Sequence, residues 1–405
     1  MADGGEQYEA SASALGYLFQ FATALHLCIE QWMNAGPDWS IAVEAADDIE
    51  QHVGSMTDLL QLKQRAVGVR LTNTSKDLWK TLRIWAEAAA AGRIDLNNTN
   101  LYLLTTAELP EGSVGCLLQH RVTRNRDEGL ALTLLCDAAK ASKTTSTELR
   151  KSFAALTGLA KPQQTALLAR IQVVGGTGDI SDVRTSMLRL AAVAAGHSAA
   201  QSFLQRLEGW FYDRVIEQMR TPGGSPVTGV EFDEFFTGLQ RQFHYDNLPI
   251  DRDIVGMSGD LGEQADKVFV QQLGLIGVGS TRIGYAVRDY VRAFAQRSRW
   301  LNESLLRAGE IGEYERRLVE EWESRFALME EELGPEATEE KMKAEARLIY
   351  RWVDTEARFQ IRDGCDEVFV TKGSYHMLAD ERRVGWHPDF AARLMQLLEP
   401  AEAHG

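Results

Sequence analysis

The segment Val43-Glu44-Ala45-Ala46-Asp47-Asp48-Ile49, followed a short way on by Gln61-Leu62-Lys63, is the feature that most constrains the fold of this 405-residue chain. Side chains alternate along a β-strand, so Gln61 and Lys63 are expected on one face and the flanking leucines on the other. By the same count, Glu44 and Asp48 are expected to share a face. Polar pairs on otherwise apolar strands require an explanation, and a functional site is the one considered first.

An acidic residue near a Gln-x-Lys triplet suits the metal-assisted cleavage of a phosphodiester. The acid can hold a divalent cation, which polarises the phosphate and lowers the pKa of an attacking water. The lysine can then assist that water or neutralise charge that builds on the scissile phosphate. The pattern also arises easily by chance, with a solvated hairpin as the alternative, so the order of the surrounding elements matters.

The surrounding sequence predicts the element order α-β-β-β-α-β. Residues 13–33 have helical apolar spacing on both sides, which predicts a buried helix. Residues 40–50 and 57–65 are predicted strands joined near Gly54, and residues 67–71 predict a third, short strand. Ser75 is the expected N-cap of a helix that Gly92 ends. The apolar run 101–104 then predicts a strand covered on both sides.

This order, with an acid in one strand and Gln-x-Lys in the next, resembles the core of PD-(D/E)XK nucleases in its Mrr-like variant. Four stretches of the chain also resemble effector nucleases of bacterial antiphage systems. The residues that carry it are Gly16-Tyr17-Leu18-Phe19-Gln20, Glu44 to Ile49, Gln61-Leu62-Lys63, and Leu78-Trp79-Lys80-Thr81-Leu82 with Trp85.

The resemblance implies a metal-dependent endodeoxyribonuclease, a hydrolase of phosphodiester bonds. It implies that Asp48 is the main metal ligand, that Gln61 and the Leu62 carbonyl complete the site, and that Lys63 is catalytic. Glu44 belongs to the same catalytic set, and whether Glu44 or Asp47 adds a ligand stays open. The implied metal is Mg²⁺, with Mn²⁺ as the alternative, and one or two ions could act. Gln20 is expected to be a buried, satisfied residue or a support for the site.

Charge gives a mixed indication of DNA binding. The chain has a formal net charge of −15, which does not favour a general nucleic-acid binder. The stretch 63–83 is locally basic, however, and could neutralise backbone phosphates. The expected nucleic-acid-binding residues there are Arg65, Arg70, Lys76 and Lys80. A solvated helix face is an equally good interpretation of the lysines taken one by one.

Length and composition bound the remaining architecture. We expect an α+β fold with a nuclease core in residues 1–130, a helical middle region in 131–250 and a helical C-terminal domain in 251–405 that serves oligomerisation or partner binding. No apolar run approaches the roughly 20 residues that span a bilayer. The four cysteines are scattered, as in a reduced cytoplasmic protein.

Two glycine-rich stretches, 175–178 and 274–279, lack the features of nucleotide-binding loops. Neither is followed by Lys-Ser or Lys-Thr, as a P-loop requires, so both are interpreted as turns. The chain is therefore not expected to be an ATPase itself. In the tail, His376, Asp380, His387 and Asp389 match no standard zinc spacing, and satisfied structural histidines are the favoured interpretation.

The C-terminal third carries a second resemblance. Its motifs are Gln296-Arg297-Ser298-Arg299-Trp300, Tyr314 with Trp322, and the tail segments Gly373-Ser374-Tyr375-His376-Met377-Leu378-Ala379-Asp380 and Gly385-Trp386-His387-Pro388. They are similar to the C-terminal domain of effectors in ABC-ATPase three-component systems, of which Lamassu is the best described.

The two likenesses together imply the nuclease subunit of a Lamassu-type antiphage system. They imply partnership with an SMC-like ABC ATPase, which senses phage DNA, and with a small third subunit. They also imply that released subunits assemble into a homo-oligomer, with a tetramer as the expected form, to cut double-stranded DNA and abort infection. No membrane partner is expected. The rivals are a catalytically silent nuclease fold that acts as an adaptor, and a helical scaffold that binds DNA without cutting it.

Overall fold

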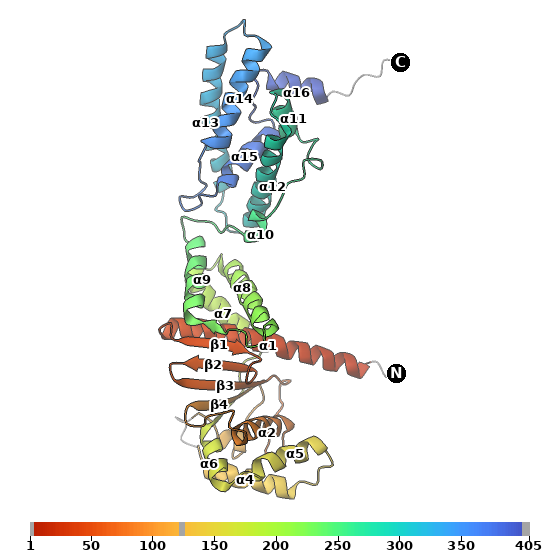
Figure 1. Cartoon of the computed structure of the whole chain (residues 1–405), viewed down its shortest axis with the longest axis vertical. Coiled ribbons are helices and arrows are strands. Elements are labelled where there is room, and N and C mark those ends of the chain that lie inside the picture. The colour runs from red at the N-terminus through yellow and green to blue at the C-terminus, as the bar shows by residue number, and fades with distance from the viewer. Residues whose placement is uncertain (1–3, 121–125, 399–405) are drawn as a thin grey trace. The chain divides into compact units, whose positions relative to one another are not determined.

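A computed structural model describes residues 4–120 and 126–398 of the chain. The chain divides into two compact units (Figure 1). The first comprises the chain up to residue 194 together with residues 203–237, and the second comprises residues 195–202 and the chain from residue 238 onward.

The N-terminal unit combines one sheet with helices. Its first elements are α1 (Gly4–Asn34), β1 (Trp39–Val43), β2 (Ile49–Val53), β3 (Met56–Lys63), α2 (Lys76–Ala90) and β4 (Thr99–Thr105). Next come α3 (Val114–Leu117), α4 (Glu128–Ala141), α5 (Thr147–Thr157), α6 (Lys161–Arg170), β5 (Ile171–Gly175) and α7 (Ile180–Ala195). The last are α8 (Ala200–Arg220), β6 (Val227–Thr228) and α9 (Gly229–Gln242).

The element order α-β-β-β-α-β is present, but its first three strands begin and end at other residues than predicted. The expected single strand 40–50 is two strands, β1 and β2, separated by a turn at residues 44–48. The expected third strand at 67–71 was wrong, because only an isolated bridge between Arg70 and Glu108 forms there. The start of α2 after Ser75 agrees with the prediction.

The sheet has six strands in the order β5-β4-β3-β2-β1-β6. Strands β3, β4 and β5 are parallel, whereas β3, β2, β1 and β6 pair antiparallel. The middle region, expected to be helical, therefore also supplies both edge strands. Strand β2 begins at Ile49, which pairs with Leu60, so residues 61–63 extend past β2 and keep only β4 as a strand partner.

One face of the sheet packs against α2 and the helical group α4–α6. Leu59, Leu101 and Val173 from three strands join Trp79 and Trp85 of α2 in one core. Figure 1 shows α4, α5 and α6 gathered beside α2. Because side chains alternate along β3, Gln61 and Lys63 share the face of Leu59 and so point toward the α2 side.

Helix α1 packs against β1 and β3, but its burial is uneven. Phe19, Leu25 and Ile29 are buried, as the helical spacing predicts. The expectation that the helix is buried on all sides was wrong, because Leu15, Tyr17 and Leu18 are all about half exposed. The buried part thus begins at Phe19 and Gln20, where the helix reaches the sheet.

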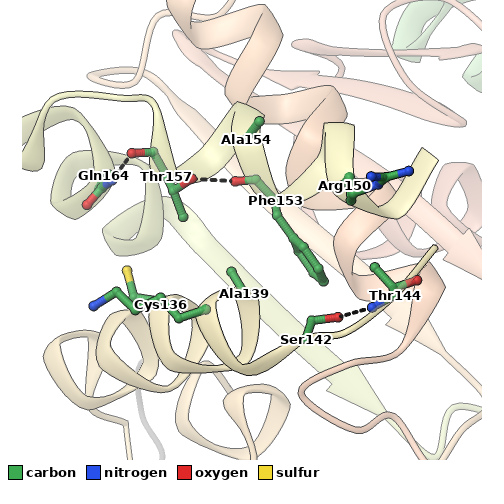
Figure 2. Close-up of a pocket in the computed structure, with 10 residues that line it drawn as sticks. Cys136, Ala139, Ser142, Thr144, Arg150, Phe153, Ala154, Thr157 and Gln164 are labelled. Carbon is green, nitrogen blue, oxygen red and sulfur yellow. Dashed lines mark hydrogen bonds between the residues drawn. The ribbon is translucent and has the colours of Figure 1, made fainter. Parts of the chain in front are cut away.

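An open groove of about 600 Å³ lies among α4, α5 and α6 (Figure 2). Its lining includes Phe153, Ala139 and Cys136, with Lys140 and Arg150 also contributing. Gln164 fixes one wall by donating hydrogen bonds to the Leu156 and Leu159 carbonyls, both at 3.1 Å. None of the site residues predicted from the sequence lines this groove.

The C-terminal unit is helical. Its elements are α10 (Arg252–Val255), α11 (Val268–Leu275), α12 (Ser280–Asn302), α13 (Glu310–Leu333), α14 (Glu339–Thr355), α15 (Val368–Asp380) and α16 (Phe390–Leu398). The apolar stripe of α13, from Tyr314 to Met329, is buried as its spacing predicts. On α12, Ile283, Val287 and Tyr290 are buried, whereas Phe294 is exposed. Within the part of the chain that the structure describes, no helix is long and apolar enough to cross a bilayer.

The tail histidines are structural. His376 and His387 are 3% and 1% exposed, and Asp380 receives hydrogen bonds from Lys267 and the Val268 backbone rather than facing either histidine. Burial lowers the pKa of His376 to about 4, so its ring is neutral at neutral pH. The expectation of satisfied histidines is only partly met, because His376 Nδ1 and His387 Nε2 are buried without a hydrogen-bond partner.

Helix α15 crosses α12 at Gly373, the first residue of the Gly-Ser-Tyr-His segment. A Cβ added at Gly373 would lie 2.2 Å from the backbone oxygen of Asp289 and 2.4 Å from Ala293 Cβ. Real Cβ atoms do not approach a backbone oxygen so closely, so glycine is required for this crossing.

We therefore expect Gly373→Ala to destabilise the C-terminal unit by about 3 kcal/mol, near the upper end for overpacking. Gly284→Ala on α12 is the matched control, since a Cβ there meets nothing within 4 Å. It should be neutral or stabilising by up to about 1 kcal/mol, because alanine favours a helix. Thermal denaturation of the two variants measures the difference, and equal midpoints would contradict the close crossing.

Candidate active site

The acidic residues form a tight turn between β1 and β2. Glu44 has φ of 52°, a left-handed conformation that is uncommon outside glycine, and its N–H donates to the Asp48 carbonyl at 3.0 Å. The prediction that Glu44 and Asp48 share a strand face was therefore wrong, because the strand ends at Val43. A strained, non-glycine backbone of this kind is often found at functional sites.

The start of the turn is held by a distant side chain. Gln218 of α8 accepts a hydrogen bond from the Val43 N–H at 3.2 Å and donates one to the Val43 carbonyl at 2.9 Å. The amide thus pairs with the last residue of β1 as a neighbouring strand would. This contact fixes the point at which the chain leaves the sheet and enters the acidic turn.

Asp48 is held against the free edge of β3. Its Oδ2 accepts the Leu62 N–H at 2.7 Å, and its Oδ1 accepts the Gln61 amide at 3.0 Å. Leu62 has no β2 partner at this point, so the carboxylate satisfies a backbone donor that β2 leaves open. Asp48 is partly exposed, which leaves the carboxylate accessible to a ligand.

The side chain of Asp47, the residue before Asp48, points into the protein. It is 7% exposed, and its oxygens accept hydrogen bonds from the indole of Trp85 at 2.6 Å, the Asp48 N–H at 3.0 Å and the Gln61 amide. Burial raises the pKa of Asp47, and the hydrogen bonds from Trp85 and Gln61 oppose that rise. All of these contacts lie within the protein, and they hold Asp47 against the Gln61 amide and the Trp85 indole.

Three oxygen atoms converge on the ammonium group of Lys63. Its Nζ lies 2.7 Å from Gln61 Oε1, 3.1 Å from the Leu62 carbonyl and 3.5 Å from Asp48 Oδ2. The sequence predicted these three residues as the metal ligands and Lys63 as their catalytic neighbour. The structure therefore brings Asp48, Gln61, Leu62 and Lys63 together in one place.

Glu44 lies at the exposed side of the same cluster. Burial raises the pKa of its carboxyl, a hydrogen bond from Gln20 opposes that rise, and the charges of Asp48 and Asp47 add to it. Gln20 is 8% exposed, and its Oε1 has no hydrogen-bond partner. Gln20 therefore supports Glu44 from α1, but it is not the fully satisfied residue that the sequence suggested.

The donor set suits a hard divalent cation. A carboxylate, an amide oxygen and a backbone carbonyl are oxygen ligands of the kind that Mg²⁺ prefers, with water completing its coordination. These three oxygens already face a single positive charge, the Lys63 ammonium. Within residues 4–120 and 126–398, no three or more His, Cys, Asp or Glu side chains are grouped to hold a metal. A cation here would depend on Asp48 and neutral oxygens.

The four basic residues predicted to contact DNA are exposed, but they differ in their partners. Arg65 donates to Asp77 through its Nε at 2.6 Å and through a second nitrogen, which offsets much of its charge. Arg70, Lys76 and Lys80 are exposed on the segment that follows Lys63 and on α2. The loop and the first turns of α2 therefore present positive charge near the acidic turn.

Two residues that organise the site were missed in the sequence. Trp85 was named among the residues that carry the nuclease resemblance but was given no role at the site, yet its indole donates to Asp47. Gln218 lies in the middle region, for which only helices were predicted, and no local pattern indicates its contact with Val43. The one available signal was that a fully buried tryptophan requires a hydrogen-bond acceptor.

Comparison with known proteins found a match in the C-terminal part alone. Residues 269–394 match the family model for C-terminal domain 7 of the ABC-three component (ABC-3C) systems. The match supports the interpretation that this chain is a component of such a system. It also suggests partnership with other ABC-3C subunits and a role in antiviral defence. No match was found among curated proteins or among solved structures.

The contact between Trp85 and Asp47 predicts a specific loss of stability. In Trp85→Phe the buried carboxylate loses a charge-assisted hydrogen bond, and we expect a cost of about 1.5–3 kcal/mol. Trp79→Phe is the matched control, because Trp79 lies on the same helix, is fully buried and donates to a neutral carbonyl, that of Asn73, at 2.7 Å.

The control should lose only about 0.5–1.5 kcal/mol of hydrogen-bond energy. The same ring is removed in both variants, so their difference in free energy of unfolding isolates the charge on Asp47. Urea denaturation of the full chain measures it. An equal loss in the two variants would show that Asp47 does not depend on Trp85.

Proposed function

We propose that the N-terminal unit is a Mg²⁺-dependent endonuclease that cuts double-stranded DNA. The observation that carries the proposal is the convergence of Asp48 Oδ2, Gln61 Oε1 and the Leu62 carbonyl beside the Lys63 ammonium. This arrangement combines a cation-binding oxygen set with a fixed positive charge. Hydrolysis of a phosphodiester needs both, because negative charge builds on the phosphate in the transition state.

Each residue of the cluster has a part in the proposed reaction. Asp48, Gln61 and the Leu62 carbonyl would hold the Mg²⁺ ion, which supplies polarisation of the phosphate and a water of lowered pKa when bound. Lys63 lies next to these oxygens and supplies positive charge at the scissile phosphate. Asp47 keeps the Gln61 amide nitrogen on its own side, so that Oε1 faces Lys63. Glu44 is placed at the exposed rim, where a water or a second ion would approach.

We infer that the chain acts as the effector of its three-component system. The support is the C-terminal match, which points to other subunits of the system. In this proposal an SMC-like ATPase detects foreign DNA, a small third subunit completes the resting complex, and assembly of released nuclease subunits activates cutting and aborts infection. Net negative charge fits an enzyme that binds chromosomal DNA weakly as a free subunit.

One observation favours a rival function. The Lys63 ammonium already contacts all three of the oxygens assigned to the metal, so the cluster could be a self-neutralised, structural ion pair. The unit would then be a silent adaptor within the same system. An adaptor would neither bind a divalent cation at Asp48 nor release cut DNA, whereas the enzyme does both.

Cleavage of supercoiled plasmid distinguishes the two functions. With Mg²⁺ and the assembled complex we expect nicked and linear products, and we expect none with EDTA. Lys63→Ala should reduce the rate by about 100-fold or more, because it removes charge that stabilises the transition state. Lys151→Ala is the control, since Lys151 is an exposed lysine on α5 of the same unit. Equal rates of cleavage by Lys63→Ala and the wild-type protein would indicate a contaminating nuclease and would contradict the proposal.

A further inference from the structure

The segment that follows the catalytic strand forms a short projecting loop. It runs from Gln64 to Arg70 and begins one residue after Lys63. Val67 at its tip is fully exposed, and Val69 is also exposed. Residues 67–71 were predicted to form a strand, and the absence of that strand leaves the Val67 and Val69 side chains exposed to solvent.

The loop is held rigidly at its base. On one side, the Arg65 N–H donates to Thr106 Oγ1 at 2.6 Å, and that hydroxyl donates to the Arg65 carbonyl at 2.9 Å. On the other side, the Glu108 N–H donates to the Val69 carbonyl at 2.9 Å, and the Leu71 N–H donates to the Glu108 carbonyl at 2.9 Å. Both ends are thus tied to the segment that follows β4.

The tip of the loop is also ordered. The Val69 N–H donates to the Ala66 carbonyl at 3.2 Å, and Gly68 has φ of 82°, which closes the turn. A left-handed conformation of this kind favours glycine over any residue with a Cβ. The exposed valines are therefore held in place by a preformed turn, and binding through them would cost little conformational entropy.

The charge of the loop complements a polyanion. Arg65 and Arg70 flank the valines, and residues 64–71 contain no acidic residue in a chain whose net charge is −15. Because Arg65 is paired with Asp77, Arg70 supplies most of the positive charge that the loop presents. Lys76 and Lys80 continue the positive charge onto the start of α2, and both are exposed. A rigid apolar tip between arginines suits a DNA groove, where apolar side chains contact base edges and sugars while arginines contact phosphates.

We propose that residues 64–70 enter a groove of duplex DNA and so position the scissile phosphate at Lys63. This inference rests on the nuclease function proposed above. In it, residues 64–70 are the part of the protein that binds the DNA groove. Val67 and Val69 contact the groove, and Arg70 contacts the backbone. Duplex DNA is the favoured occupant over a protein partner, because the valines lie between basic residues and directly follow the catalytic lysine in the chain.

Binding of a labelled blunt DNA duplex tests the loop without cleavage. Fluorescence anisotropy would be followed with the assembled complex that carries Lys63→Ala, without divalent cations, over a series of salt concentrations. Adding Val67→Ser should weaken binding about 5-fold and leave the salt dependence unchanged, because an apolar contact is lost. Adding Arg70→Ala should reduce the slope of log affinity against log salt by about 1, because one phosphate contact is lost.

Val193→Ser on α7 is the matched control, since Val193 is a similarly exposed valine of the same unit. It should change neither affinity nor slope. If Val67→Ser and Val193→Ser have the same DNA affinity, the loop does not enter the groove and the proposal is overturned. That result would not contradict the proposed nuclease function. The same holds if Val67→Ser loses a co-purifying protein subunit but keeps its DNA affinity. If the assembled complex that carries Lys63→Ala binds no duplex at all, the proposed nuclease function is contradicted together with the role of the loop.

Discussion

The pairing of the Asp48 carboxylate with the free end of β3 is the contact on which the candidate site depends. Strand β2 stops one residue short of Gln61, so the Leu62 N–H would otherwise lack a partner on that side. Asp48 accepts this N–H and the Gln61 amide, which locks the turn to the strand. Because the same carboxylate remains partly exposed, one residue both completes the sheet and faces the site.

Two neighbouring acids therefore have different roles because of their surroundings. Asp47 points into the core, where Trp85 and Gln61 satisfy it and burial raises its pKa. Asp48 points along the sheet edge toward Lys63. Both acids lie in the turn between β1 and β2. The left-handed backbone of Glu44 and the amide of Gln218 fix the start of this turn. The turn is thus fixed at both ends, and the catalysis proposed for this site would require such a preorganised turn.

Sequence reasoning was strongest where one local rule governs the outcome. Alternation placed Gln61 and Lys63 on one face, and the apolar stripe of α13 followed from spacing. Ser75 marked the start of α2 correctly, although its side chain makes no capping hydrogen bond. Sequence reasoning failed where contacts are distant in the chain. The conformation of Glu44 depends on how β1 and β2 join, and the strand predicted at residues 67–71 lacked a partner to pair with. Trp85 and Gln218 act through the packing of α2 and α8, which periodicity does not encode.

The central claim is that Asp48 and its neighbours bind a divalent cation, and Mn²⁺ binding measured by electron paramagnetic resonance tests it most directly. Asp58→Asn is the matched control, because Asp58 is also a carboxylate of β3 and accepts a hydrogen bond from Asn100 at 2.8 Å. The account predicts a Mn²⁺ site in the wild-type chain and in Asp58→Asn, weakened about 10-fold or more in Asp48→Asn. Equal Mn²⁺ affinity in Asp48→Asn and the wild-type chain would contradict it.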